Sequence, residues 1–198
     1  ADLEKRIARS EGEEGGRLVV IEGIYSMLGD RAPIREFVDL KKRVGFQILA
    51  DEAHSFGVLG PHGRGLADEA GVEDDIDFVV GTFSKSVGAI GGFGAGDHPM
   101  FEALRYGMRP YMFTASASPS SVATSLAAVR KLAAEPERRE RLMANSARLH
   151  AGFKALGLIH PLADGKADRR HPRLFRRQQV VQARESGACL GGPRHRRG

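Results

Sequence analysis

The sequence predicts an α/β fold with a mainly parallel β-sheet flanked by helices. Short continuous apolar runs, typical of strands buried on both faces, alternate along the 198 residues with segments of helical periodicity. Polar side chains directly follow two of these runs, as expected at the carboxyl ends of parallel strands. With 41% hydrophobic and 28% charged residues, the composition is that of a globular protein and not of a collagenous or broadly disordered one.

The first fifty residues predict helices and strands in alternation. Residues 1–11 are charged and helix-prone, and the glycines that follow end this helix. Residues 17–22 (RLVVIE) predict a buried strand. Pro33 opens the next helix, whose apolar residues recur at three- and four-residue spacing until Gly45 ends it. Residues 46–50 (FQILA) predict a second strand, which runs into a polar segment.

The middle of the chain predicts two further strands and then two long helices. Residues 77–81 (DFVVG) form an apolar run, and residues 91–95 are Gly-rich but strand-like. The pattern turns helical from Pro119, and Pro136 suits the first turn of a second helix that ends before Gly157. Each helix carries one apolar stripe, and the stripes consist of Val122, Leu126, Val129 and Leu132, and of Leu142, Leu149, Phe153 and Leu156.

The chain divides into two parts, residues 1–158 and residues 159–198. Residues 163–198 hold ten Lys or Arg and three Asp or Glu, a net charge of +7, whereas the other 162 residues carry a net charge of −2. The second part has no sustained period and few large apolar residues, so we expect it to be disordered. It is either a basic segment that binds nucleic acid or membrane, or the product of a reading-frame shift, which its abrupt start favours.

The sequence argues against several classes of protein. Its longest apolar runs are a few residues long, far below the roughly 20 residues that cross a bilayer. Residues 1–5 are polar and do not resemble a secretory signal, and the single cysteine, Cys189, excludes an internal disulfide framework. His54, His62 and His98 show no metal-ligand spacing. We therefore expect a cytoplasmic protein without a metal site.

Polar residues after two successive strands form the strongest functional signal. Asp51 and His54 follow one strand, and Thr82, Ser84 and Lys85 follow the next. The 34 positions between Asp51 and Lys85 fit one crossover connection, so both groups are expected at the same edge of the sheet. A lysine that forms a Schiff base, an acid that keeps a pyridine nitrogen protonated and hydroxyls that hold a phosphate fit a pyridoxal 5'-phosphate (PLP) site.

Other interpretations of these motifs are weaker. The tetrapeptide DEAH at residues 51–54 also occurs in helicases, but no Gly-rich loop with Gly-Lys-Ser/Thr lies upstream of it. Residues 88–96 contain no G-x-G-x-x-G pattern that opens a helix, which a dinucleotide loop requires. Ser84, His54 and Asp51 have the residue types of a hydrolase triad, but no G-x-S-x-G elbow surrounds Ser84.

Four segments resemble the α-oxoamine synthase family of PLP-dependent enzymes. They are EGIYSMLGD (22–30), DEAHSFGVLGPHGRG (51–65), GTFSKSVGAIGGF (81–93) and RPYMFTAS (109–116). The resemblance covers residues 1–158 and implies an incomplete large domain of the PLP fold-type I, or aminotransferase-like, architecture together with the start of the following helices. It implies an acyltransferase that condenses an amino acid with an acyl-CoA and releases CO2.

The resemblance also implies a role for each site residue. Lys85 would form the Schiff base with PLP, Asp51 would pair with its pyridinium nitrogen, and His54 would bond its ring hydroxyl. These three are the predicted catalytic residues.

The remaining predicted cofactor-binding residues are Thr82 and Ser84, which would hold the phosphate, and Ser26, which would lie beside the cofactor. Thr114 would reach the cofactor phosphate of a second subunit, because the active sites of the family form at the interface of a homodimer.

The substrates and the competing functions follow from finer features. The motif Phe83–Ser86 and the tripeptide Arg109–Tyr111 resemble the branch of the family that uses L-serine and a long-chain acyl-CoA. A sister branch, such as the one that makes 8-amino-7-oxononanoate, is the first alternative.

Family members are about twice as long, so we expect this fragment to be inactive. A non-catalytic product with a basic segment for nucleic acid or lipid is the second alternative. We expect no nucleic-acid partner, and membrane contact only through a lipid product.

Overall fold

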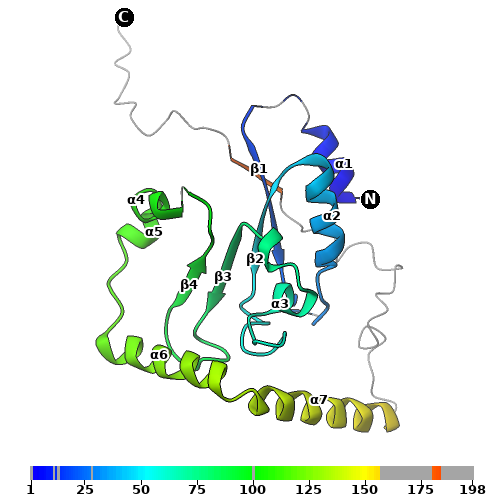
Figure 1. Ribbon diagram of the computed structural model, residues 1–198, viewed down its shortest axis with the longest axis vertical. Coiled ribbons are helices and arrows are strands. Elements are labelled where there is room, and N and C mark those ends of the chain that lie inside the picture. Colours follow the sequence, from blue (N-terminus) through cyan, green and yellow to red (C-terminus); the bar gives the residue numbers. More distant parts are fainter. Residues whose placement is uncertain are drawn as a thin grey trace, which may run out of the picture.

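The computed structural model describes residues 2–10, 12, 14–27, 29–99, 101–156 and 180–183. Within these residues the strands form one sheet in the order β4-β3-β2-β1-β5 (Figure 1). The strands are β1 (Gly16–Glu22), β2 (Gln47–Asp51), β3 (Phe78–Thr82), β4 (Gly92–Ala95) and β5 (Val180–Ala183). The pairs β1–β2 and β2–β3 are parallel, and the edge strands β4 and β5 are antiparallel to their neighbours. The predicted α/β class with a mainly parallel sheet is confirmed.

The three parallel strands end together, and this register positions the candidate site. Asp51, the last residue of β2, is aligned with Glu22 on β1 and with Val80 on β3. Hydrogen bonds continue beyond the strand ends, because the N–H of Gly23 donates to the carbonyl of Asp51 (2.8 Å) and the N–H of Glu52 donates to that of Val80 (2.8 Å). The segment after β2 therefore leaves the sheet from a fixed position.

Helices α1 (Asp2–Arg9) and α2 (Ile34–Val44) pack against the sheet beside β1 and β2 (Figure 1). Their apolar faces meet the strand residues in one core, whose members include Leu3, Ile7, Phe37, Val38, Leu40, Val19, Ile21 and Ile48. Gly45 ends α2 as predicted, with a positive φ of 68° that favours glycine. Lys41 on α2 bonds the carboxylate of Asp77 (2.6 Å) just before β3, which ties the helix to the sheet.

Several short helices were not predicted. They are α3 (Leu66–Ala70), α4 (Leu104–Gly107) and α5 (Arg109–Met112), together with the 3-10 turns η1 (Glu73–Asp75) and η2 (Phe101–Ala103). Each has three to five residues, which is too few to show a helical period in the sequence.

The two long helices are confirmed as α6 (Pro119–Ala134) and α7 (Glu137–Ala155). Ser118 caps α6, since its hydroxyl accepts a hydrogen bond from the N–H of Ser121 (3.3 Å). Their apolar stripes, however, are largely exposed. Most members of both stripes lie on the surface, namely Val122, Leu126, Leu142, Leu149, Phe153 and Leu156.

The basic segment at 159–198 lies almost entirely outside the described residues. Four of its residues form β5, which pairs with β1 in antiparallel register. The rest of the segment, and the expectation of disorder made for it, lie outside what the structure describes. In the described part of the chain, none of the helices combines the length and the apolar character that a membrane-spanning helix needs.

Candidate active site

Asp51 and His54 lie in the connection that leaves the end of β2. The side chain of Asp51 is half-buried, and its Oδ1 accepts a hydrogen bond from the N–H of Ala53 (2.9 Å). A carboxylate that bonds the backbone two residues ahead stabilises a turn. This turn starts the connection and places His54 directly after it.

The last residue of β3 and the turn after it carry two hydroxyls beside the lysine. Thr82 and Ser84 are in contact, with 2.8 Å between their hydroxyl oxygens, and the N–H of Ser84 also donates to Thr82 Oγ1 (3.2 Å). Thr82 donates in turn to the carbonyl of Gly91 (3.2 Å), which starts the return to β4. Lys85 is exposed in this β3–β4 turn.

A pocket of about 380 Å³ brings His54 and Lys85 together. Its walls come from both strand-end segments and from helices α6 and α7. The residues that line it are Ala53, His54, Phe56, Gly57, Val58, Lys85, Ser86, Ala128, Lys131, Leu132, Glu135, Arg138, Arg139 and Leu142. The volume lies within the range of small-molecule sites, roughly 300–1,000 Å³. Asp51, Thr82 and Ser84 do not line the pocket but stand next to it in the chain.

Ser26 and Thr114 occupy other positions. Ser26 is exposed, and its N–H donates to the carboxylate of Glu22 (3.3 Å). Thr114 is exposed after α5, where its hydroxyl donates to the carbonyl of Pro110. Neither residue lines the pocket of His54 and Lys85, so their cofactor contacts stay predictions.

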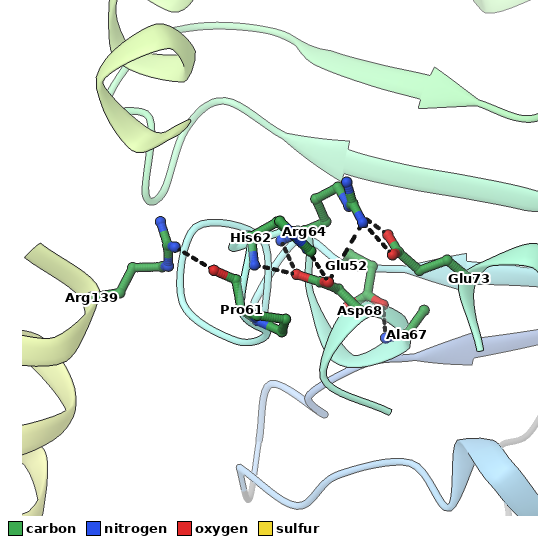
Figure 2. Close-up of polar contacts among 8 residues, drawn as sticks. All are labelled: Glu52, Pro61, His62, Arg64, Ala67, Asp68, Glu73 and Arg139. Atoms are coloured by element: carbon green, nitrogen blue, oxygen red, sulfur yellow. Dashed lines mark hydrogen bonds and ion pairs between the residues drawn. The ribbon is translucent and has the colours of Figure 1, made fainter. Parts of the chain in front are cut away.

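Two buried carboxylates organise the loop that carries His54, and the sequence analysis missed both. Glu52 and Asp68 are 0% and 5% exposed. Glu52 accepts hydrogen bonds from the backbone N–H groups of Leu66 (2.9 Å) and Ala67 (3.1 Å) and from the hydroxyl of Ser55. Figure 2 shows both carboxylates inside the loop. No local sequence signal marks Glu52, because the backbone groups of Leu66 and Ala67 that it binds lie 14 and 15 residues away.

Asp68 holds the far side of the same loop. It accepts hydrogen bonds from the N–H groups of His62 (2.9 Å) and Arg64 (3.1 Å) and from the ring Nδ1 of His62 (2.9 Å). Burial by itself would raise the pKa of Asp68. The hydrogen bonds from His62 and Arg64, with the nearby Arg64 charge, outweigh burial and lower this pKa below its ordinary value. The carboxylate is therefore held in its charged form.

The α6–α7 wall of the pocket is rich in charge. Glu135 pairs with Lys131 (3.0 Å) and with Arg138, and the hydrogen bonds from Arg138 and Lys131 lower the pKa of Glu135. Arg139 donates instead to two carbonyls, those of Leu132 (2.7 Å) and Pro61 (2.7 Å). The second bond joins α7 to the loop between β2 and α3 (Figure 2).

The residues present fit PLP. The Lys85 amine and the His54 imidazole line one pocket wide enough for a small cofactor, and a carboxylate and two hydroxyls lie in the same two strand-end segments. Lys85 supplies the amine, and Thr82 and Ser84 present hydroxyls and an N–H of the kind that bind phosphate. The described residues contain no group of three or more His, Cys, Asp or Glu that could hold a metal ion.

Residues 1–166 match the family model for aminotransferases of class I and II, and the chain belongs to this family. It is 53% identical to a serine palmitoyltransferase of Caulobacter vibrioides and 55% identical to one of Sphingomonas paucimobilis. These alignments cover 80% and 79% of this chain but 39% and 37% of those proteins. An 8-amino-7-oxononanoate synthase of Anaeromyxobacter dehalogenans is 46% identical over 71% of this chain and 36% of that protein.

The solved structures that resemble this chain include enzymes of the same kind. A high-resolution structure of serine palmitoyltransferase with a PLP internal aldimine matches with a TM-score of 0.75 and 55% identity, over 79% of this chain and 39% of that one. The Sphingomonas paucimobilis enzyme with a bound PLP–myriocin aldimine matches with a TM-score of 0.75 and 54% identity, over 79% of this chain and 40% of that one. These findings confirm the resemblance to α-oxoamine synthases and the fold-type I architecture. The chain spans about two fifths of the length of these relatives.

Proposed function

We propose that this chain is the PLP-binding part of a serine palmitoyltransferase, which condenses L-serine with a long-chain acyl-CoA and releases CO2. The observation that carries the proposal is the pocket shared by His54 and Lys85 at the ends of two adjacent parallel strands. The higher identity to the serine palmitoyltransferases of Caulobacter vibrioides and Sphingomonas paucimobilis, 53–55% against 46%, supports serine over the substrate of an 8-amino-7-oxononanoate synthase.

Each site residue has one task in this proposal. When bound, PLP supplies an electron sink that stabilises negative charge at the α-carbon of the amino acid. The Lys85 amine would hold the cofactor and, once free, would accept the proton from the serine α-carbon. Asp51 keeps a proton on the pyridine nitrogen, and His54 donates a hydrogen bond to the ring hydroxyl.

The remaining roles concern the cofactor phosphate and the bonds that form and break in the substrates. Thr82 and Ser84 bind the cofactor phosphate, with Ser26 beside the cofactor. The serine α-carbon would form a bond to the acyl carbonyl carbon as CoA leaves as its thiolate. The carboxylate of serine would then leave as CO2, its electron pair would stay on the α-carbon, and the proton that Lys85 had accepted would return to that carbon. The product is a 3-keto sphingoid base, a lipid that brings the enzyme into peripheral contact with a membrane while the protein itself stays cytoplasmic.

The proposal also includes the oligomeric state of the intact enzyme. The intact enzyme is a homodimer in which Thr114 binds the cofactor phosphate of the other subunit. The exposed Tyr111, Met112 and Phe113 beside Thr114 support a protein contact on this segment. Because the chain spans about two fifths of its relatives, we expect the isolated chain to bind PLP weakly and to turn over little or no substrate.

Residues 159–198 are, in this proposal, the product of a reading-frame shift. The family match ends at residue 166, close to the change in composition and charge. Reading the coding DNA in the other frames near codon 160 tests this directly. We expect one frame to stay open and to restore α/β periodicity; closed frames would favour a genuine basic extension.

A labelling experiment tests the cofactor lysine. The chain is incubated with PLP, reduced with borohydride and digested, and the modified lysine is located by mass spectrometry. We expect the label on Lys85, its loss in Lys85→Ala, and its retention in Lys131→Ala, whose lysine lines the same pocket. Equal labelling of both lysines, or an unchanged label in Lys85→Ala, would contradict the proposal.

A further inference from the structure

Glu52 is a buried acid that the proposed chemistry does not use. It lies in the chain between Asp51 and His54, and its side chain is fully enclosed at 0% exposure. A carboxylate in such a position needs donors to offset the loss of water. It has three, since the N–H groups of Leu66 (2.9 Å) and Ala67 (3.1 Å) and the hydroxyl of Ser55 all donate to it.

Two glycines make room for this carboxylate. A Cβ atom added at Gly23 would lie 2.2 Å from Glu52 Oε2, and one added at Gly65 would lie 2.4 Å from the same oxygen. Gly65 also has a φ of +118°, which side chains rarely adopt. The chain thus surrounds Glu52 with backbone from the end of β1 and from the start of α3, and a side chain at either glycine would meet the carboxylate and force one of the two to shift.

The contacts of Glu52 hold the two ends of the loop at residues 53–67 together. Its side chain joins Leu66 and Ala67, at the far end of the loop, to the start of the loop. At the near end, its carbonyl accepts hydrogen bonds from the N–H groups of Ser55 (3.0 Å) and Phe56 (2.7 Å). His54 lies between residues that are bound on both sides, namely Asp51–Ala53 and Ser55. Its backbone therefore has little freedom to leave the pocket.

We propose that Glu52 is a positioning residue, which fixes residues 53–67 and thereby holds His54 beside Lys85. The role in catalysis rests on the proposed function, because it matters only if His54 binds the cofactor. The fixed loop itself is a property of the chain without any ligand.

Glu52→Ala and Glu52→Gln should differ in how much of the hydrogen bonding in the loop they remove. Glu52→Ala leaves the N–H groups of Leu66 and Ala67 and the Ser55 hydroxyl buried without this acceptor, which is the costly way to lose a hydrogen bond. Glu52→Gln has nearly the same shape. Its amide oxygen accepts from one of the two N–H groups, and its amide nitrogen donates to the Ser55 hydroxyl, but the other N–H then faces the amide NH2 and loses its acceptor. The conservative variant should therefore keep only part of the loop order.

The experiment compares the full chain with Glu52→Ala, Glu52→Gln and Val38→Ala. Val38 is 2% exposed on α2, makes none of the hydrogen bonds of Glu52, and its truncation controls for a general loss of stability. Hydrogen exchange of residues 53–67 is measured without PLP, and PLP affinity is measured by titration of the visible absorbance. We expect Glu52→Ala to lose protection in the loop and about tenfold in PLP affinity, a typical cost of removing a group that orients a ligand-binding residue. Glu52→Gln should lose less of both than Glu52→Ala, and Val38→Ala should retain both.

Two results would overturn the proposal. One is loop protection in Glu52→Ala that equals that of Val38→Ala. The other is loss of PLP affinity in Val38→Ala as large as in Glu52→Ala, which would mean that stability alone is responsible. If Glu52→Ala fails to fold, Glu52→Gln decides: a folded variant in which loop protection and PLP affinity fall together supports the proposal, and normal PLP affinity with an unprotected loop contradicts it. If the unaltered chain is not labelled by PLP at Lys85, the proposed function falls, whereas loop exchange still decides the role of Glu52.

Discussion

The sheet body, residues 2–99, and the helical arm, residues 101–156, differ in how they treat their apolar side chains. In the body, α1, α2 and the parallel strands bury theirs in one core. In the arm, among its described residues, only Ser125 is buried, while leucines, tyrosines and phenylalanines lie on the surface. Figure 1 shows α7 extending away from the sheet. The body covers its apolar side chains with its own residues. The arm exposes apolar side chains of the kind that contact another protein surface.

The two regions meet at the loop that carries His54. Leu132 on α6 approaches Gly57 and Gly63 closely enough that a Cβ at either glycine would lie within 3 Å of it. Arg139 on α7 adds its hydrogen bond to Pro61. The candidate pocket is thus walled by the well-packed body on one side and by the less packed arm on the other.

The largest effect is expected from a leucine-to-alanine substitution in the core of the body. Leu40 on α2 is 6% exposed and belongs to the core. Leu40→Ala should lower the free energy of unfolding by about 2–5 kcal/mol, because it removes buried methyl groups and leaves a cavity. Urea denaturation monitored by circular dichroism measures the change. A loss below about 0.5 kcal/mol, the usual size of a surface effect, would show that the body is not packed as described.

The next effect is a pH dependence that should be confined to the body. The pKa of Asp68 is lowered in the folded chain, so its contribution to stability is present above the ordinary pKa of about 4 and is lost as the pH falls through the folded value. Between about pH 5 and pH 2, the unaltered chain should therefore lose more stability than Asp68→Asn. Denaturation midpoints across this range measure the difference.

Glu135 in the arm is the matched control for Asp68. Its pKa is also lowered, by Arg138 and Lys131, but the pair is exposed to solvent, where ion pairs contribute little. Glu135→Gln should leave the acid dependence of stability unchanged. If Glu135→Gln flattened the curve as much as Asp68→Asn, burial would not be the feature that separates the two carboxylates.

A smaller effect is expected where the regions meet. Arg139→Ala removes the hydrogen bonds to Pro61 and Leu132 and should cost about 1–2 kcal/mol, at about 1 kcal/mol for each typical hydrogen bond. Hydrogen exchange should rise in α7 and in residues 57–63 but not in β1. Arg138→Ala, which removes only a pair with Glu135, is the control and should leave the loop unchanged. An unchanged loop in Arg139→Ala would show that α7 is held by other contacts.

Much of the body could be predicted because its signals are local. Continuous apolar runs gave β1, β2 and β3 to within about one residue, and Pro33 and Gly45 bounded α2. His54 and Lys85 could be placed together because each follows a strand and neighbouring parallel strands end at the same edge. The cofactor contacts themselves remain predictions.

Other features depend on contacts that no local pattern reveals. Glu52 bonds backbone groups 14 and 15 residues away, so its burial cannot be seen in the tetrapeptide that contains it. The helices α3, α4 and α5 are too short to show a period. In α6 and α7 the period shows which side chains share a face, but not whether anything covers that face.

The smallest expected effect is the counterpart of the first. Leu149 on α7 is 59% exposed, so Leu149→Ala removes little buried surface and leaves no cavity. Its free energy of unfolding should lie within about 0.5 kcal/mol of the unaltered chain, as for surface substitutions in general. The same urea experiment serves for both leucines, and their difference measures the contrast between body and arm with identical chemistry. A loss of several kcal/mol in Leu149→Ala would place α7 in a packed interface in solution. Such an interface would mean that a second copy of the chain already covers the arm, and the loss would then fall as the protein is diluted.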